Sequence, residues 1–267
     1  MRRVFALVAK ELVDLRQNPA VFLPAVLTGL ASIALPFFVA VIVPYVSGER
    51  LSDSSDFQIA VEMFRTQPAM RALDPEGAIQ AWIFQQFVLL LTVTPIAGAM
   101  SIASAAVVGE KQARTLEPLL ATPLTTVELL SAKVLGALIP SLALTFACFA
   151  VYVGAVGVLA HPGVYRALLE PRSLAIMFVI GPLAALAALQ LAVCVSSRVN
   201  DPRSAQQIGA LIILPISGLL VAQLVGGAQL TAVVLLAISS VLIALNAALM
   251  RIGIALFDRE SILTRWK

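Results

Sequence analysis

The residues best placed to carry a function lie at positions 109–133, which read GEKQARTLEPLLATPLTTVELLSAK. Within this segment Leu116, Leu119 and Leu120 are spaced i, i+3 and i+4, so a helix here carries all three on one face. A helix with one apolar face, held at a membrane surface, is suited to docking onto another protein. An ordinary loop between two membrane spans fits the same residues, and their pattern alone leaves both interpretations open.

Capping and turn residues divide this segment into two helices. Thr115 is placed to cap the first helix, and Pro118 lies early enough in it to be tolerated in the first turn. Pro123 ends that helix. Thr125 and Glu128 then form a Thr-x-x-Glu capping box, which predicts the start of the next helix.

The run 110–124, continued by Glu128 and Lys133, resembles the signature of ATP-binding-cassette type-2 exporter permeases. In that family the segment is a coupling helix that sits in a groove of a separate ATPase subunit. Arg114 is a minor departure, since the family usually has Gly before the Thr. The resemblance implies an ATPase-coupling set made of Glu110, Arg114, Thr115, Leu116, Glu117, Leu119 and Leu120.

The motifs that an enzyme needs are missing from the sequence. It has no G-x-x-x-x-G-K-[ST] phosphate-binding loop, so any ATP and Mg must be bound by a partner subunit. No His, Cys, Asp and Glu residues have metal-ligand spacing, and the single histidine, His161, excludes an H-E-x-x-H zinc site. No G-x-S-x-G motif occurs. We therefore expect no catalytic, cofactor-binding or metal site in this chain.

The composition is that of a polytopic membrane protein. Of the 267 residues, 60% are hydrophobic and 12% are charged, whereas about a quarter of a typical soluble domain is charged. The apolar residues occur in long blocks. Cys148 and Cys194 both lie inside such blocks, which indicates that they are inert, small hydrophobic residues. We expect one all-α transmembrane permease domain over residues 1–267, with no nucleic-acid partner.

The predicted elements follow from these apolar blocks. Residues 3–17 fit an amphipathic helix that lies in the membrane interface and ends at Asn18-Pro19. Lys10-Glu11 matches a pair often found in the interfacial elbow helix of the resembling family. We predict an elbow helix within 1–19, an outer loop at 47–80, the coupling segment at 109–133, and six spans at 20–46, 81–108, 134–159, 174–195, 208–224 and 230–250.

The distribution of basic residues predicts the orientation. We assign the segments between successive spans to alternate sides of the membrane, starting from the coupling segment. On this assignment 13 of the 18 Lys and Arg residues fall on the side of the coupling segment. The other side has five, namely Arg50, Arg65, Arg71, Arg166 and Arg172. The positive-inside rule therefore places both termini and the coupling segment in the cytoplasm, as expected for a multi-pass protein of the cytoplasmic membrane.

The spans carry no acidic or basic residue near their midpoints, which argues against a proton-coupled carrier. The polar residues that remain have two open interpretations, as contacts to a transported substrate or as interhelical hydrogen-bond partners. The candidates for lining a transport pathway are Gln85, Gln86, Ser101, Ser104 and Gln223.

Three functions are compatible with these observations. The leading one, implied by the resemblance, is the membrane subunit of an ATP-driven exporter, working as a homodimer or related heterodimer with two copies of an ATPase. The alternatives are an ion-coupled carrier or channel that works alone, and a membrane scaffold for a cytoplasmic partner. Positions 196–207 and 259–267 are most similar to the sodium-extruding subgroup of the family.

Overall fold

The structure is a computed structural model that describes residues 2–53, 73–112, 125–196, 202–224 and 230–256. Within these ranges every regular element is helical. The predicted all-α fold with six spans is confirmed, because six helical stretches are long and apolar enough to cross a membrane. They are Pro19–Ser47, Pro75–Ala106, Val127–Leu159, Pro171–Ser196, Gln206–Leu224 and Ala232–Leu256.

The first span is preceded by an amphipathic helix and changes helix type along its length. Helix α1 (Arg2–Gln17) covers the residues for which an elbow helix was predicted, and Asn18 separates it from the span. Pro36 lies inside the span and removes a backbone donor, and a π-helical turn begins two residues later. The elements of the span are η1 (Pro19–Phe22), α2 (Leu23–Phe37), η2 (Phe38–Ile42) and α3 (Val43–Ser47).

The second span is the core of the described fold. It consists of α5 (Pro75–Leu91) and α6 (Val93–Gln112), separated at Thr92. Its most apolar window is 89% buried, whereas those of the first, third, fifth and sixth spans are 12–28% buried. The apolar side chains that those four spans leave exposed fit contact with lipid.

The third span is one long helix, and the fourth begins in a short folded loop. Helix α8 (Thr126–Leu159) holds Pro140 in its interior. After it come α9 (Tyr165–Leu168), α10 (Pro171–Ala175), η5 (Ile176–Ile180) and α11 (Gly181–Ser196). The remaining elements are α12 (Pro202–Gly209), η6 (Ala210–Ile212), α13 (Ile213–Leu224) and α14 (Ala232–Leu256).

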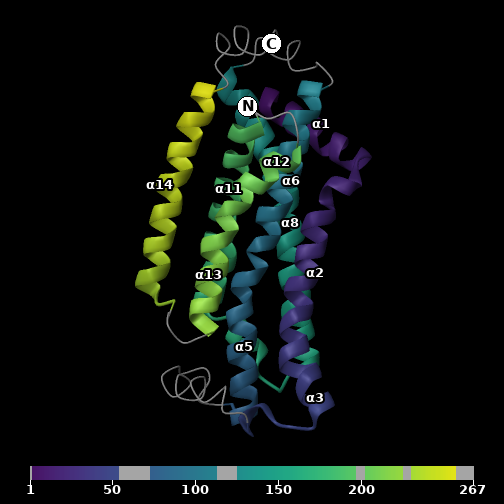
Figure 1. The fold of residues 1–267 in the computed structure, drawn as a ribbon, viewed down its shortest axis with the longest axis vertical. Coiled ribbons are helices and arrows are strands. Elements are labelled where there is room, and N and C mark those ends of the chain that lie inside the picture. The colour runs from purple at the N-terminus through teal and green to yellow at the C-terminus, as the bar shows by residue number, and fades with distance from the viewer. Residues whose placement is uncertain (1, 54–72, 113–124, 197–201, 225–229, 257–267) are drawn as a thin grey trace.

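The two ends of the bundle carry different elements (Figure 1). One end, called the inner end below, holds α1, the end of α6, the start of α8 and the end of α14. The opposite end, called the outer end, holds α3, the start of α5 and the turn η3 (Leu51–Asp53). The coupling segment therefore joins two helices that meet at the inner end.

Candidate functional site

The predicted capping box at the start of α8 is present. The hydroxyl of Thr125 accepts a hydrogen bond from the backbone N–H of Glu128 at 3.2 Å. The carboxylate of Glu128 in turn accepts one from the backbone N–H of Thr125 at 2.9 Å. These reciprocal bonds satisfy two backbone donors that a helix start otherwise leaves unpaired, so α8 begins at a defined residue within the predicted coupling segment.

The first turns of α8 are bound to the elbow helix by a buried ion pair. Lys133 Nζ lies 3.4 Å from Glu11 Oε1, and the two side chains are only 2% and 10% exposed. One turn later α8 has Gly136, where a Cβ atom would come within 2.8 Å of the Cβ of Glu11. The absence of a side chain at Gly136 therefore lets α1 approach α8 closely enough for the pair to form.

The same end of α8 is packed on its other sides as well. Leu130 is buried in a cluster that draws residues from α6, α8 and α11. A Cβ atom at Gly253 of α14 would lie 3.0 Å from Leu130 Cδ2, so α14 also packs closely there. The start of α8 thus contacts four other helices, α1, α6, α11 and α14.

Most of the predicted ATPase-coupling set lies outside the described residues. Glu110 belongs to α6, which continues to Gln112. Arg114, Thr115, Leu116, Glu117, Leu119 and Leu120 fall in 113–124, which the structure does not describe. The assignment of these residues stays a prediction, and the described flanks, α6 and α8, are the parts on which it can be argued.

Two of the residues predicted to line a pathway, Gln85 and Gln86, are buried in the outer half of the fold. Gln85 Nε2 donates to the backbone oxygen of Ala167 at 3.2 Å and to Glu170 Oε2 at 2.8 Å. Arg172 Nη2 donates to Gln86 Oε1 at 3.3 Å. Both amides therefore bind the folded loop that carries α9 and α10, and neither faces water in the described structure.

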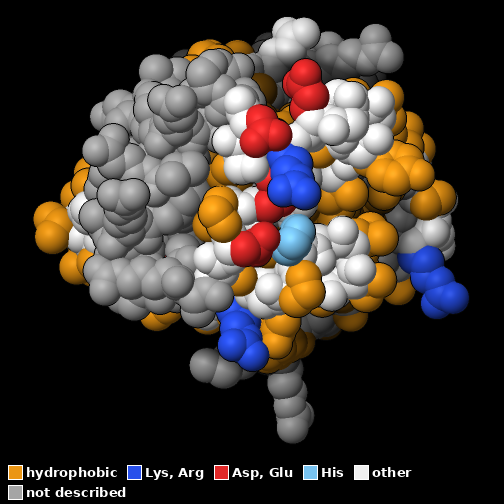
Figure 2. Space-filling model, turned by 90° about the horizontal axis from the view of Figure 1, so that it is seen from below, with side chains coloured by type: hydrophobic (Ala, Val, Ile, Leu, Met, Phe, Trp, Pro, Cys, Tyr) orange, Lys and Arg blue, Asp and Glu red, His pale blue; other side chains and the backbone are white. Residues whose placement is uncertain are grey.

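Helix α5 makes further hydrogen bonds to the turn η3, which follows the first span, and to the third span. The carboxylate of Glu76 accepts from the backbone N–H groups of Leu51 and Ser52, each at 3.2 Å. The hydroxyl of Tyr152, in α8, donates to the backbone oxygen of Phe84 at 2.9 Å. Figure 2 shows acidic and basic side chains gathered close together on this outer face.

Gln80 of α5 connects the same two spans. Its amide nitrogen donates to the backbone oxygen of Ala40 in the first span at 3.3 Å. Its amide oxygen accepts from the backbone N–H of His161, just after the third span, at 2.9 Å. His161 lies in a loop, and its Nδ1 is 3.5 Å from the carboxylate of Asp74. Together these contacts make α5 the hydrogen-bonding centre of the outer end.

Ser101 and Ser104, also predicted to line a pathway, are brought together in the inner half of α6. The amide nitrogen of Gln206, in α12, donates to both hydroxyls, at 3.4 Å and 3.2 Å. Both serines are buried. This contact links the second span to the start of the fifth.

Gln223, the last of these candidates, has no hydrogen-bond partner for either amide atom among the described residues. It lies in α13, and its side chain is buried at 2% exposure. An unpaired buried amide costs about 1–3 kcal/mol, so a polar partner for Gln223 would stabilise the protein. Of the five candidates, only Gln223 combines full burial with an amide that is unpaired at both atoms.

Comparison with known protein families identifies the family to which the chain belongs. The sequence profile described as "ABC-2 family transporter protein" matches residues 66–250, which is more than half of the chain. This protein belongs to the ABC-2 transporter family. No curated protein matches it at a significant level. The matched range covers the second to fifth spans, the coupling segment and most of the sixth span.

Membership of the ABC-2 family makes the chain a permease, the transmembrane component of an ABC transporter, and implies an ABC ATPase as its partner. Within the described ranges no group of three or more His, Cys, Asp or Glu side chains is arranged to hold a metal ion.

Several side-chain contacts in this ABC-2 protein could not be predicted from its sequence. Glu11 and Lys133 were each noted as family-like residues, but their pairing was not predicted. The contacts of Gln206 with α6, and of Glu170 and Arg172 with α5, carry no local signal, because each joins residues more than 80 positions apart.

Proposed function

We propose that this chain is the membrane half of an ATP-driven exporter, in which a separate ATPase drives movement of a substrate across the cytoplasmic membrane. Two permease copies, identical or related, work with two ATPase copies, which bind the ATP and Mg. ATP binding closes the ATPase pair and displaces the coupling segment. That displacement biases the membrane helices between two arrangements, which is the requirement for coupling.

The observation that best supports the proposal is the attachment of α8. This helix starts at a capped residue within the predicted coupling segment, and its first turns are bound to α1 by the Glu11–Lys133 pair. They also pack against α6, α11 and α14. A force on the coupling segment is therefore transmitted to several spans rather than absorbed in a loose connection.

The test is to reconstitute the permease with its ATPase and to measure ATP hydrolysis and substrate transport in the same vesicles. We expect Leu120→Asp to keep membrane insertion but to lower transport per ATP hydrolysed at least tenfold, because a charge on the docking face removes its apolar contact. Leu120→Met keeps that contact and is the matched control. Glu117→Ala should act in the same direction, with Glu49→Ala as its control on the outer side.

Two results would overturn the proposal. One is a purified permease that neither co-purifies with an ABC ATPase nor changes its rate of hydrolysis. The other is full transport in ATP-free liposomes under an ion gradient, which would instead support a carrier or channel that works alone. Sodium is the first substrate to test, because positions 196–207 and 259–267 are similar to sodium-extruding permeases.

A further inference from the structure

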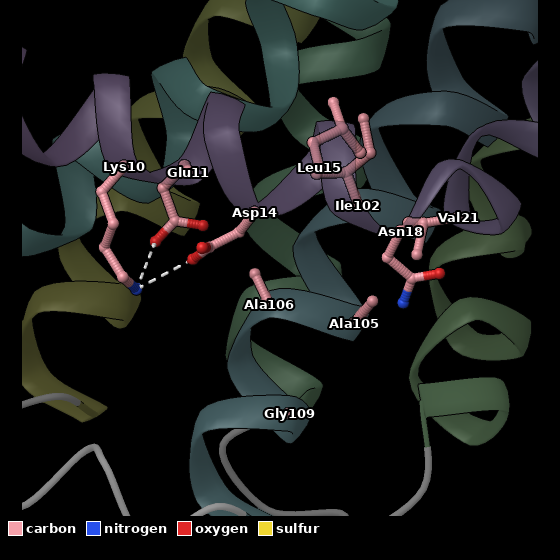
Figure 3. Close-up of a pocket in the computed structure, with 10 residues that line it drawn as sticks. All are labelled: Lys10, Glu11, Asp14, Leu15, Asn18, Val21, Ile102, Ala105, Ala106 and Gly109. Atoms are coloured by element: carbon pink, nitrogen blue, oxygen red, sulfur yellow. Dashed lines mark ion pairs between the residues drawn. The ribbon is translucent and has the colours of Figure 1, made fainter.

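A cavity of about 390 Å³ lies at the inner end of the fold, between the elbow helix and the second span. Figure 3 shows its lining side chains: Lys10, Glu11 and Asp14 gather at one side, and Ala105, Ala106 and Gly109 lie along α6. Its other lining residues are Leu15, Asn18, Val21 and Ile102.

The lining residues place the cavity at the level of the lipid head groups. Asn18 directly precedes the first span, which begins at Pro19, and Gly109 follows the second span, which ends at Ala106. Helix α1 is amphipathic and lies beside these two span ends, as an interfacial helix does. The cavity therefore lies where two spans leave the hydrocarbon layer.

The charges around the cavity form two pairs of different character. Glu11 is bonded to Lys133, whose side chain is 2% exposed, and this buried pair belongs to the protein's own packing. Lys10 and Asp14 form the second pair, 3.3 Å apart, with side chains that are 46% and 53% exposed. Lys10 Nζ also lies 3.9 Å from Glu11 Oε1, so the two pairs touch at their margin (Figure 3). An exposed pair of this kind contributes only about 0–1 kcal/mol, so its two members can exchange partners with a ligand at little cost.

Lys133 does not line the cavity, but it neutralises Glu11. The two lining charges that remain, on Lys10 and Asp14, cancel, so the site favours neither a simple anion nor a simple cation. A zwitterion complements it, with its negative group at Lys10 and its positive group at Asp14. Leu15, Val21 and Ile102 supply an apolar wall beside these charges. Apolar groups gain free energy by leaving water for such a wall, so the ligand should be amphiphilic as well as zwitterionic.

We propose that the cavity binds the head group of an amine-bearing zwitterionic phospholipid, with its phosphate at Lys10 and its ammonium at Asp14. The glycerol region and the first methylene groups lie against Leu15, Val21 and Ile102. Phosphatidylethanolamine has this chemistry. The site depends only on the location of the chain in a membrane, so it stands or falls separately from the coupling mechanism.

The test uses the purified full chain in detergent, with native mass spectrometry to count retained lipids. Phosphatidylethanolamine and phosphatidylglycerol of identical acyl chains are added separately. We expect one phosphatidylethanolamine to be retained about fivefold more tightly than phosphatidylglycerol, since a half-exposed charge contact is worth up to about 1 kcal/mol. Asp14→Asn should abolish this preference, whereas Asp53→Asn, which removes an exposed carboxylate at the outer end, should leave it unchanged.

A second variant fills the cavity without changing its charge. Ala106→Leu extends a side chain into the space that Figure 3 shows beside Asp14, and it should weaken retention of both lipids by a similar factor. Glycerophosphoethanolamine, the head group without acyl chains, should fail to displace the lipid at equal concentration. The proposal is overturned by equal retention of the two lipids, by an unchanged preference in Asp14→Asn, or by displacement with the soluble head group.

Discussion

The outer and inner ends of this permease are held together by different interactions. At the outer end, α5 uses Glu76, Gln80, Gln85 and Gln86 to bind the first span, the loop after the third span and the beginning of the fourth. At the inner end, a buried ion pair joins α1 to α8, one glutamine joins α12 to α6, and a cavity of about 390 Å³ separates α1 from α6.

This difference shows which end can rearrange at lower cost. The outer contacts are spread over one central helix, so a movement there must break several hydrogen bonds together. Among the described residues, the polar contacts of the inner end join separate pairs of helices, and the cavity leaves space for α1 and α6 to move relative to each other. The proposed coupling segment joins α6 to α8 at this end. The predictions below test this contrast in order of expected effect.

The largest effect is expected from Lys133→Met. This change leaves the Glu11 carboxylate, only 10% exposed, without its buried partner, and such a change costs about 3 kcal/mol of stability. The measurement is the midpoint of denaturation of the purified protein in detergent. The double variant Glu11→Leu/Lys133→Met removes both charges and should recover most of the loss, because no buried charge is then left unpaired. A double variant as unstable as the single one would show that the pair itself does not join the two helices.

A smaller effect is expected from Tyr152→Phe at the outer end. The aromatic ring stays in place, but the hydrogen bond from its hydroxyl to the backbone oxygen of Phe84 is lost, which costs about 1 kcal/mol. The same denaturation midpoint measures it. Tyr165→Phe, at an exposed tyrosine in α9, is the matched control and should change nothing. Equal midpoints for the two variants would contradict the role given to this bond.

The smallest effect is expected from Gln206→Leu. The lost contacts to Ser101 and Ser104 are worth about 0.5 kcal/mol in a membrane protein, so the effect should be local to α12. Hydrogen exchange of the α12 backbone amides should become roughly twofold faster. Gln207→Leu changes the exposed neighbouring glutamine and should leave the exchange rate as it is. Faster exchange in both variants would mean that these serines do not hold α12.

The sequence was sufficient to predict the features that depend on local residues. The six spans follow from the need for long apolar helices in a bilayer, and the start of α8 follows from Thr125 and Glu128. Asp74 and Pro75, at the start of α5, are residue types typical of a helix start, although the Asp74 side chain makes no capping hydrogen bond.

Contacts between distant residues could not be predicted in the same way. Glu11 and Lys133 are 122 positions apart, and only the crossing of α1 and α8 at Gly136 brings them together. Gln85 and Gln86 had two open interpretations from the sequence, as contacts to a substrate or as interhelical hydrogen-bond partners. In the structure the loop after α8 folds back against α5, so Ala167, Glu170 and Arg172 occupy that position. Whether any of the five polar candidates contacts a substrate stays a prediction.

The account rests on the coupling segment lying in the cytoplasm and contacting an ATPase. The most direct measurement is maleimide labelling of a Glu117→Cys variant in which Cys148 and Cys194 are replaced by alanine. We predict no labelling by a membrane-impermeant maleimide in intact cells, full labelling after permeabilisation, and protection when the ATPase is bound. Labelling in intact cells, or equal labelling with and without the bound ATPase, would contradict the account.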